Sequence, residues 1–210
     1  ELNRVDDTQL DTMVASNTAL ARYKPILDQM RAMKPYQLSD ELEKFLHDQS
    51  VVGAAAWNRL FDETMAGLTF DVDGEEMNLE ATLNLLSDAD RGTREKGAKA
   101  LVTVFKSNIS LFARITNTLA KEKEVEDRWR GLPTPQAGRH LANHVEPEVV
   151  EALRDAVVAA YPKLSHRYYA LKAKWMGLET LEMWDRNAPL PDEDSAAISW
   201  DDARAMVMEA

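Results

Sequence analysis

The chain has 210 residues, of which 45% are hydrophobic and 29% are charged, and it contains no cysteine. A chain of this size and composition can fold around its own core, and the lack of thiols excludes disulfides and thiolate metal sites. The 36 acidic and 25 basic residues give a net charge of -11, which opposes binding to nucleic acid and anionic membranes. A cytoplasmic location is therefore expected.

The first predicted element is one long amphipathic helix over residues 7–33, where apolar residues recur at helical spacing. Lys34 and Pro35 end this helix because proline cannot continue it. Ser39 is predicted to cap a second helix, whose buried face contains Leu42, Phe45 and Leu46. A third helix is predicted over residues 51–65.

A small β-hairpin is predicted after the third helix. Leu68, Phe70 and Val72 alternate with a period of two, and Asp73-Gly74 is a typical two-residue hairpin turn. The acidic residues in 71–75 also resemble the start of a calcium-binding loop. The twelve-residue calcium loop is not completed by a glutamate at its last position, so the hairpin is the preferred interpretation.

Core helices are predicted in the middle of the chain. Ser87, with Asp90 three residues later, is expected to begin a helix. A nearly continuous apolar stripe follows along this helix, formed by Ala98, Leu101, Val102, Phe105, Ile109, Phe112, Ile115 and Leu119. Such a stripe indicates packing against other helices and not a cofactor site.

The last third of the chain is predicted to be helical with several breaks. Two prolines within residues 133–135 interrupt the pattern, and Pro147 suits the first position of a helix over 147–160. Pro162 restarts the helix, which Gly177 ends as a C-cap. A final helix begins near Ser199, and one face of it carries Trp200, Ala203, Met206 and Val207.

Two sequence features are candidates for chemical sites. His140 and His144 have the spacing of the two histidines of a zinc-binding HExxH helix, but Leu141 replaces the catalytic glutamate and no third ligand is identified. We interpret them as polar residues of a helix surface or groove. The alternating charges in residues 121–127 indicate a solvent-exposed helix face with ion pairs, although they could also be read as an acid–base pair.

Several blocks resemble the oligoendopeptidase F family of thimet-oligopeptidase-like zinc metallopeptidases. The strongest blocks are residues 119–131, 139–143, 145–150, 161–175 and 184–191, and weaker ones are 87–91 and 115–119. The resemblance implies a cytosolic peptidase that hydrolyses short peptides in a channel walled by helices. Family members carry HExxH and a further glutamate ligand C-terminal to the matched region, so it gives this chain no catalytic, cofactor-binding or metal-binding residue.

The expected fold is mainly α, a multi-helix array with one small β-hairpin that is part of a larger helical peptidase fold. Residues 1–210 are expected to form a single helical region, truncated before the zinc-binding part, because Glu1 is not methionine and the last helix has no continuation. The expected function is the channel wall and scaffold of a zinc oligopeptidase, inactive alone. Its partners would be the missing catalytic part and, in the longer protein, zinc and short peptides. The alternative is a free-standing helical interaction module.

Overall fold

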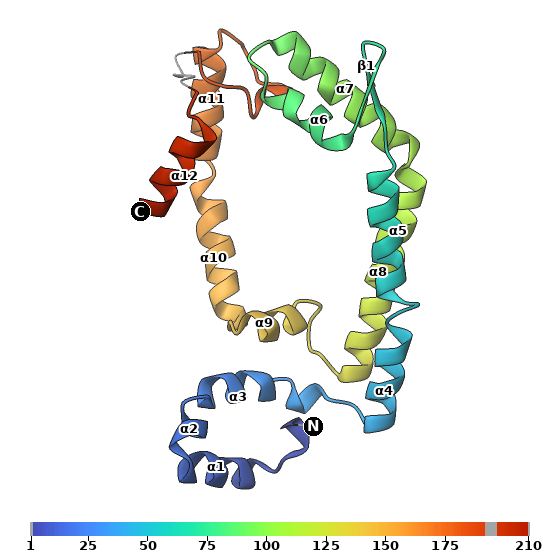
Figure 1. Cartoon of the computed structure of the whole chain (residues 1–210), viewed down its shortest axis with the longest axis vertical. Helices are drawn as coiled ribbons and strands as arrows, with labels where there is room; N and C mark the ends of the chain where they lie inside the picture. Colours follow the sequence, from blue (N-terminus) through green and yellow to red (C-terminus); the bar gives the residue numbers. More distant parts are fainter. Residues whose placement is uncertain (1, 192–196, 210) are drawn as a thin grey trace. The chain divides into compact units, whose positions relative to one another are not determined.

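The computed structural model describes residues 2–191 and 197–209. The chain forms two compact units, the first from the described parts of Glu1–Leu68 and Phe105–Ala160 and the second from those of Thr69–Val104 and Tyr161–Ala210. Helices dominate both units, and the described residues contain a single two-stranded antiparallel sheet (Figure 1). This confirms the predicted fold class. The residues Glu1 and Ala210, on which the prediction of a truncated chain depended, lie outside the described ranges.

The first unit consists of short N-terminal helices followed by longer ones. Its elements are η1 (Leu2–Arg4), α1 (Asp7–Ser16), α2 (Thr18–Ala21), α3 (Lys24–Arg31), η2 (Lys34–Tyr36), α4 (Asp40–Gln49), α5 (Ala54–Ala66), α8 (Ile109–Arg130), α9 (Ala137–Asn143) and α10 (Pro147–Ala160). Helix α5 packs alongside α8 (Figure 1), where the rings of Phe61 and Phe112 meet edge to face at 5.9 Å between centroids. This helix pair is the framework of the unit.

The prediction of one long helix over residues 7–33 was wrong, because three helices occupy this stretch. Asn17 is extended, with φ of -133°, and its side chain accepts hydrogen bonds from the backbone N–H groups of Ala19 and Leu20. Asn17 therefore ends α1 and caps α2, a role that asparagine takes more readily than a position inside a helix. Pro25 stands in the first turn of α3, and the first turn is the part of a helix in which proline is tolerated.

Helix α4 begins as predicted, but its buried face was assigned wrongly. The Ser39 hydroxyl accepts a hydrogen bond from the N–H of Leu42 at 3.4 Å, which confirms the cap. Leu42 and Phe45 are nevertheless exposed, and Leu46 is only half-buried. Helical spacing shows that these side chains share a face, but it does not say whether another element covers that face.

The second unit contains the hairpin and the helices around it. Its elements are β1 (Phe70–Val72), β2 (Glu75–Met77), α6 (Leu79–Asn84), η3 (Leu85–Ser87), most of α7 (Arg91–Ser107), α11 (Ser165–Trp175), η4 (Met183–Asp185) and α12 (Trp200–Glu209). Val72 pairs with Glu75, so Asp73 and Gly74 form the turn, with φ of 57° and 87°. Positive φ at both positions is typical of the type I′ turn, and the predicted hairpin is confirmed.

The apolar stripe in the middle of the chain runs over two helices, not one. Helix α7 begins at Arg91 because the Asp90 carboxylate accepts hydrogen bonds from the N–H and hydroxyl of Thr93, so the predicted start at Ser87 was wrong. Asn108, with φ of -101° and ψ of 4°, separates α7 from α8. The stripe is buried at Ala98 and Leu101 in the second unit and at Ile115 in the first.

The predicted signals in the last third of the chain are confirmed at three places. Pro147 is the first residue of α10, Gly177 follows α11 with φ of 68°, and the Ser199 hydroxyl accepts a hydrogen bond from the N–H of Asp202 at the start of α12. Each signal acts on backbone groups within a few residues of itself. Within the described ranges, no helix is long and apolar enough to cross a membrane.

Candidate functional site

The first unit contains a large open groove. It has a volume of about 1460 Å³ and is lined by α4, the start of α5 and one face of α8. At one end the lining is apolar, with Leu42, Phe45, Leu46, Val52, Val125 and Trp129. At the other end it is polar, with Ser110, Arg114, Asn117 and Thr118.

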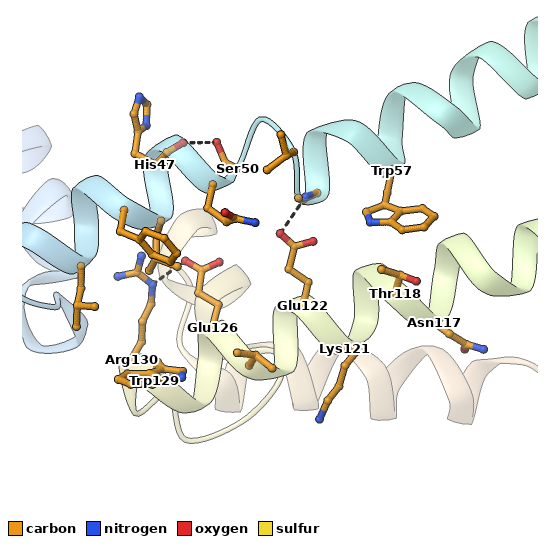
Figure 2. Close-up of a pocket in the computed structure, with 18 of the residues that line it drawn as sticks. His47, Ser50, Trp57, Asn117, Thr118, Lys121, Glu122, Glu126, Trp129 and Arg130 are labelled. Atoms are coloured by element: carbon orange, nitrogen blue, oxygen red, sulfur yellow. Dashed lines mark hydrogen bonds and ion pairs between the residues drawn. The ribbon is translucent and has the colours of Figure 1, made fainter.

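The lining residues of α8 follow from the period of the helix. They recur at steps of three and four residues from Ser110 to Arg130, which places them on one face over more than five turns. Figure 2 shows Trp57 reaching from α5 toward this face of α8. The exposed Leu42 and Phe45 of α4 belong to the groove, so the face expected to be buried is instead the wall of an open site.

Glu122 connects α8 to the start of α5. Its Oε1 accepts a hydrogen bond of 2.9 Å from the backbone N–H of Ala54, the first residue of α5 (Figure 2). A carboxylate at a helix start satisfies a free N–H and interacts favourably with the helix dipole. Gly53 makes this approach possible, because a Cβ at position 53 would lie 2.4 Å from that oxygen.

Arg130 closes the apolar end of the groove. Its Nη1 and Nη2 donate to the two oxygens of Glu43 at 2.7 and 3.1 Å, and its Nε donates to Glu126 at 2.8 Å. The hydrogen bond from Arg130 lowers the pKa of Glu43, helped by the backbone N–H of Leu38, and outweighs the effect of burial. These contacts, with the side chains of Arg130 and Glu43 largely buried, fix the start of α4 on the end of α8.

The charged run over residues 121–127 combines two roles. Lys121 pairs with Glu124 at 2.5 Å, and Lys123 pairs with Asp127, which confirms the expected solvent-exposed face with ion pairs. Glu122 and Glu126 instead face the groove, and both are engaged by groups of the first unit. An acid–base pair is not supported, because these two carboxylates serve to position helices.

The form of the groove suits an extended, partly apolar chain. Aromatic and aliphatic side chains at one end offer contact area, and the amide of Asn117 and the hydroxyls of Ser110 and Thr118 offer donors and acceptors at the other. Binding sites for small peptides combine such apolar walls with a few polar groups that fix orientation. The groove therefore has the chemistry of a binding surface.

The structure separates the two histidines considered in the sequence. His140 lies in α9, but His144 follows the end of that helix in the left-handed region, with φ of 53°. His144 therefore does not continue the helix that contains His140, because the helix ends at Asn143. Neither residue lines the groove. Over the part of the chain that the structure describes, no group of three His, Cys, Asp or Glu side chains is arranged to hold a metal ion.

The second unit contains an ion cluster in which Arg94 and Asp185 are buried and Arg91 is partly exposed. Asp185 is 0% exposed and Arg94 is 1% exposed, and Arg94 Nη2 donates to Asp185 at 3.0 Å. Arg91 donates to the same carboxylate through Nε and Nη2. Burial alone would raise the pKa of Asp185, but hydrogen bonds from Arg91, the backbone N–H of Glu182 and Arg94 lower it to about 2.

This cluster explains two of the blocks that carry the family resemblance. Arg94 also donates to the carbonyls of Asp88, Ala89 and Trp184, so it joins residues 87–91 to residues 184–191. Buried Lys172 donates to the carbonyls of Arg186 and Ala188 and holds the second block from α11. In this structure, both blocks make the contacts that hold the second unit together.

Sequence reasoning missed the groove and both of these charge networks. One signal was available: Glu122, Glu126 and Arg130 are four residues apart and share a face that differs from the face of Glu124 and Arg128. This spacing separates the charged residues that face the groove from those that face solvent. Their partners, Ala54 and Glu43, lie 68 and 87 residues away, and no local pattern identifies them.

A family model described as Oligopeptidase F matches residues 1–70. Among curated relatives, the group B oligopeptidase PepB of Streptococcus agalactiae is 26% identical over 209 residues, which cover 97% of this chain and 34% of that protein. Oligopeptidase PepF of Bacillus subtilis is 20% identical over 215 residues, covering 100% of this chain and 32% of that protein. The chain thus spans about a third of the length of the curated relatives that it matches.

Solved structures show the same fold. The oligoendopeptidase-F of Enterococcus faecium superposes with a TM-score of 0.78 at 24% identity, covering 93% of this chain and 38% of that one. A peptidase structure from Chlamydophila abortus has a TM-score of 0.74 at 17% identity, covering 99% of this chain and 35% of that one. The helical arrangement is therefore shared with part of larger proteins.

Proposed function

We propose that this chain, which belongs to the oligopeptidase F family, supplies a non-catalytic helical portion of a zinc metallo-oligopeptidase that hydrolyses short peptides. The longer protein that would contain this chain is called the parent below. The groove along α8 would form part of the wall of its substrate channel, and the ion-paired helices would be its scaffold. Zinc and the residues that activate water would come from the rest of the parent, which we place in the cytoplasm.

The observation that carries this proposal is the groove itself. It is long, open and lined by apolar and hydrogen-bonding side chains, while the carboxylates in it are already engaged by Arg130 and by the N–H of Ala54. A group whose lone pairs are occupied in this way positions helices and is poorly placed to accept a proton from substrate. The groove therefore supports binding without chemistry.

Helix α12 supports the view that this chain is part of a larger protein. Trp200, Met206 and Val207 share one of its faces and are exposed. Large exposed apolar patches mark surfaces that another element or protein covers. Together with coverage of about a third of the curated relatives, this favours a scaffold over the alternative of a free-standing interaction module.

The first experiment compares the 210-residue chain with the parent. We expect the parent to contain zinc and an HExxH sequence and to cleave short fluorogenic peptides, and we expect the chain alone to show no cleavage above a buffer control. Cleavage by the chain alone, surviving removal of contaminating peptidases, would contradict the proposal. A gene that encodes no HExxH segment would support the interaction module.

The second experiment tests the groove in the parent. Phe45 lines the groove and is 60% exposed, and Ile109 is equally exposed but does not line it. We expect Phe45→Ala to raise KM about 3- to 10-fold with little change in kcat, because it removes contact made equally in the ground and transition states. Ile109→Ala is the matched control and should leave both constants unchanged. An unchanged KM for Phe45→Ala would remove the groove from the substrate path.

A further inference from the structure

Helix α10 is the least covered long helix of the first unit. Val149, Leu153 and Val157 are 54%, 64% and 43% exposed, and Val150 and Ala160 are its only half-buried residues. A helix of 14 residues that leaves this much apolar surface in water is not stabilised by packing of its own. An exposed apolar face of this kind is typical of a helix that packs against a partner surface.

The exposed apolar residues of α10 form a stripe on one face. Val149, Leu153 and Val157 are spaced by four residues and therefore lie in a row, with Ala156 and Ala160 beside them. Glu151, Asp155 and Val158 lie on the opposite face. This is the amphipathic pattern of a surface helix with one side packed on a core, but the stripe has no such core beneath it.

We propose that the Val149–Leu153–Val157 stripe of α10 is the docking surface for the remaining part of the parent, and that the segment seated on it is an apolar helix face of that part. This inference rests on the proposed function. The curated relatives extend over about three times the length matched by this chain, so a large body of additional protein is available to cover the stripe. The narrow, aliphatic and uncharged form of the stripe matches the ridge of another helix.

Two adjacent valines, one in the stripe and one on the opposite face, allow the docking surface to be tested with a matched control. Val157 lies in the stripe and Val158 lies on the opposite face, at 43% and 54% exposure. In the 210-residue chain, Val157→Glu and Val158→Glu should both leave the melting temperature within about 1 °C of the wild type, because both sites face water. In the parent, Val157→Glu should lower the melting temperature by at least about 3 °C, because the carboxylate would be buried without a partner, and Val158→Glu should not.

A labelling experiment makes the test independent of folding defects. Photochemical carbene labelling should modify Val149, Leu153 and Val157 in the wild-type 210-residue chain and leave them protected in the wild-type parent, with Val158 labelled in both. Equal labelling of the stripe in the two proteins would overturn the inference. Dimerisation of the 210-residue chain that Val157→Glu abolishes would also overturn it, because a second copy would then be the occupant.

These outcomes are distinguishable from failure of the proposed function. A parent that contains zinc and cleaves peptides, but whose stability is equally insensitive to both substitutions, retains the function and rejects the docking surface. A protein that protects the stripe but neither binds zinc nor cleaves peptides retains the docking surface and rejects the function.

Discussion

In the second unit, Arg94 and Asp185 of the ion cluster are buried, whereas the apolar stripe of α10 in the first unit is exposed. Asp185 and Arg94 carry charges and are completely enclosed, whereas Leu153 is aliphatic and 64% exposed. The charges can be buried because the chain supplies a hydrogen-bonding partner for each. The stripe is open in the first unit, because the described part of that unit supplies nothing to cover it. Burial in this protein is therefore decided by the availability of partners and not by the polarity of the residue alone.

The largest effect is expected from breaking the ion cluster. Asp185→Ala leaves the Arg94 guanidinium buried without its carboxylate, which should lower the free energy of unfolding by about 3–5 kcal/mol. Urea denaturation followed by circular dichroism measures this loss. Lys96→Ala removes the cation of an exposed pair with Asp73 and is the control, which should change stability far less. Equal effects of the two substitutions would contradict the central role of the cluster.

A second prediction uses pH to weaken the same cluster. Because the pKa of Asp185 is about 2 in the folded chain and 3.8 without the protein environment, its contribution is complete above about pH 4 and is lost as pH falls toward 2. The shift corresponds to about 2 kcal/mol. The difference in unfolding free energy between wild type and Asp185→Asn should therefore narrow over that interval. A difference that stays constant from pH 5 to 2 would show that Asp185 is not stabilised as an anion.

A third prediction concerns the first unit, where Glu122 caps α5. Glu122→Ala leaves the N–H of Ala54 without its partner and should cost about 1–2 kcal/mol in thermal or urea unfolding. Glu124→Ala is a control on the same helix, because Glu124 is exposed and forms surface ion pairs with Lys121 and Arg128. If both variants unfold alike, the cap contributes nothing beyond a surface ion pair.

The smallest effect is expected at the stripe of α10. Leu153→Gln should change the unfolding free energy of the 210-residue chain by less than about 0.5 kcal/mol, because Leu153 faces water and both residues are good helix formers. The same urea titration measures it. A loss above about 2 kcal/mol would mean that Leu153 is buried in this chain and would remove the contrast with the ion cluster.

Most helices and strands were predictable from the sequence, but the elements that pack on their apolar faces were not. The apolar spacing in α4, α7 and α8 correctly indicated helices, and the mainly helical fold with one hairpin was confirmed. The same spacing failed at Leu42 and Phe45, which line the groove instead of a core. It also failed at Asn17 and Asn108, where one residue ends a helix although the apolar pattern continues. Periodicity reports which residues share a face and carries no information on what lies opposite.

The sequence by itself determined the features that depend on neighbouring residues. The Asp73-Gly74 turn, the Ser39 cap, Pro147 at a helix start and Gly177 after a helix end follow from backbone conformation and hydrogen bonds within a few residues. Only the tertiary structure decided that Asp185 meets Arg94, 91 residues away, and that Glu122 meets Ala54, 68 residues away. Such pairs form because the fold brings distant segments together. Each contact is stronger where the two segments exclude water from it, and the local sequence does not show where that happens.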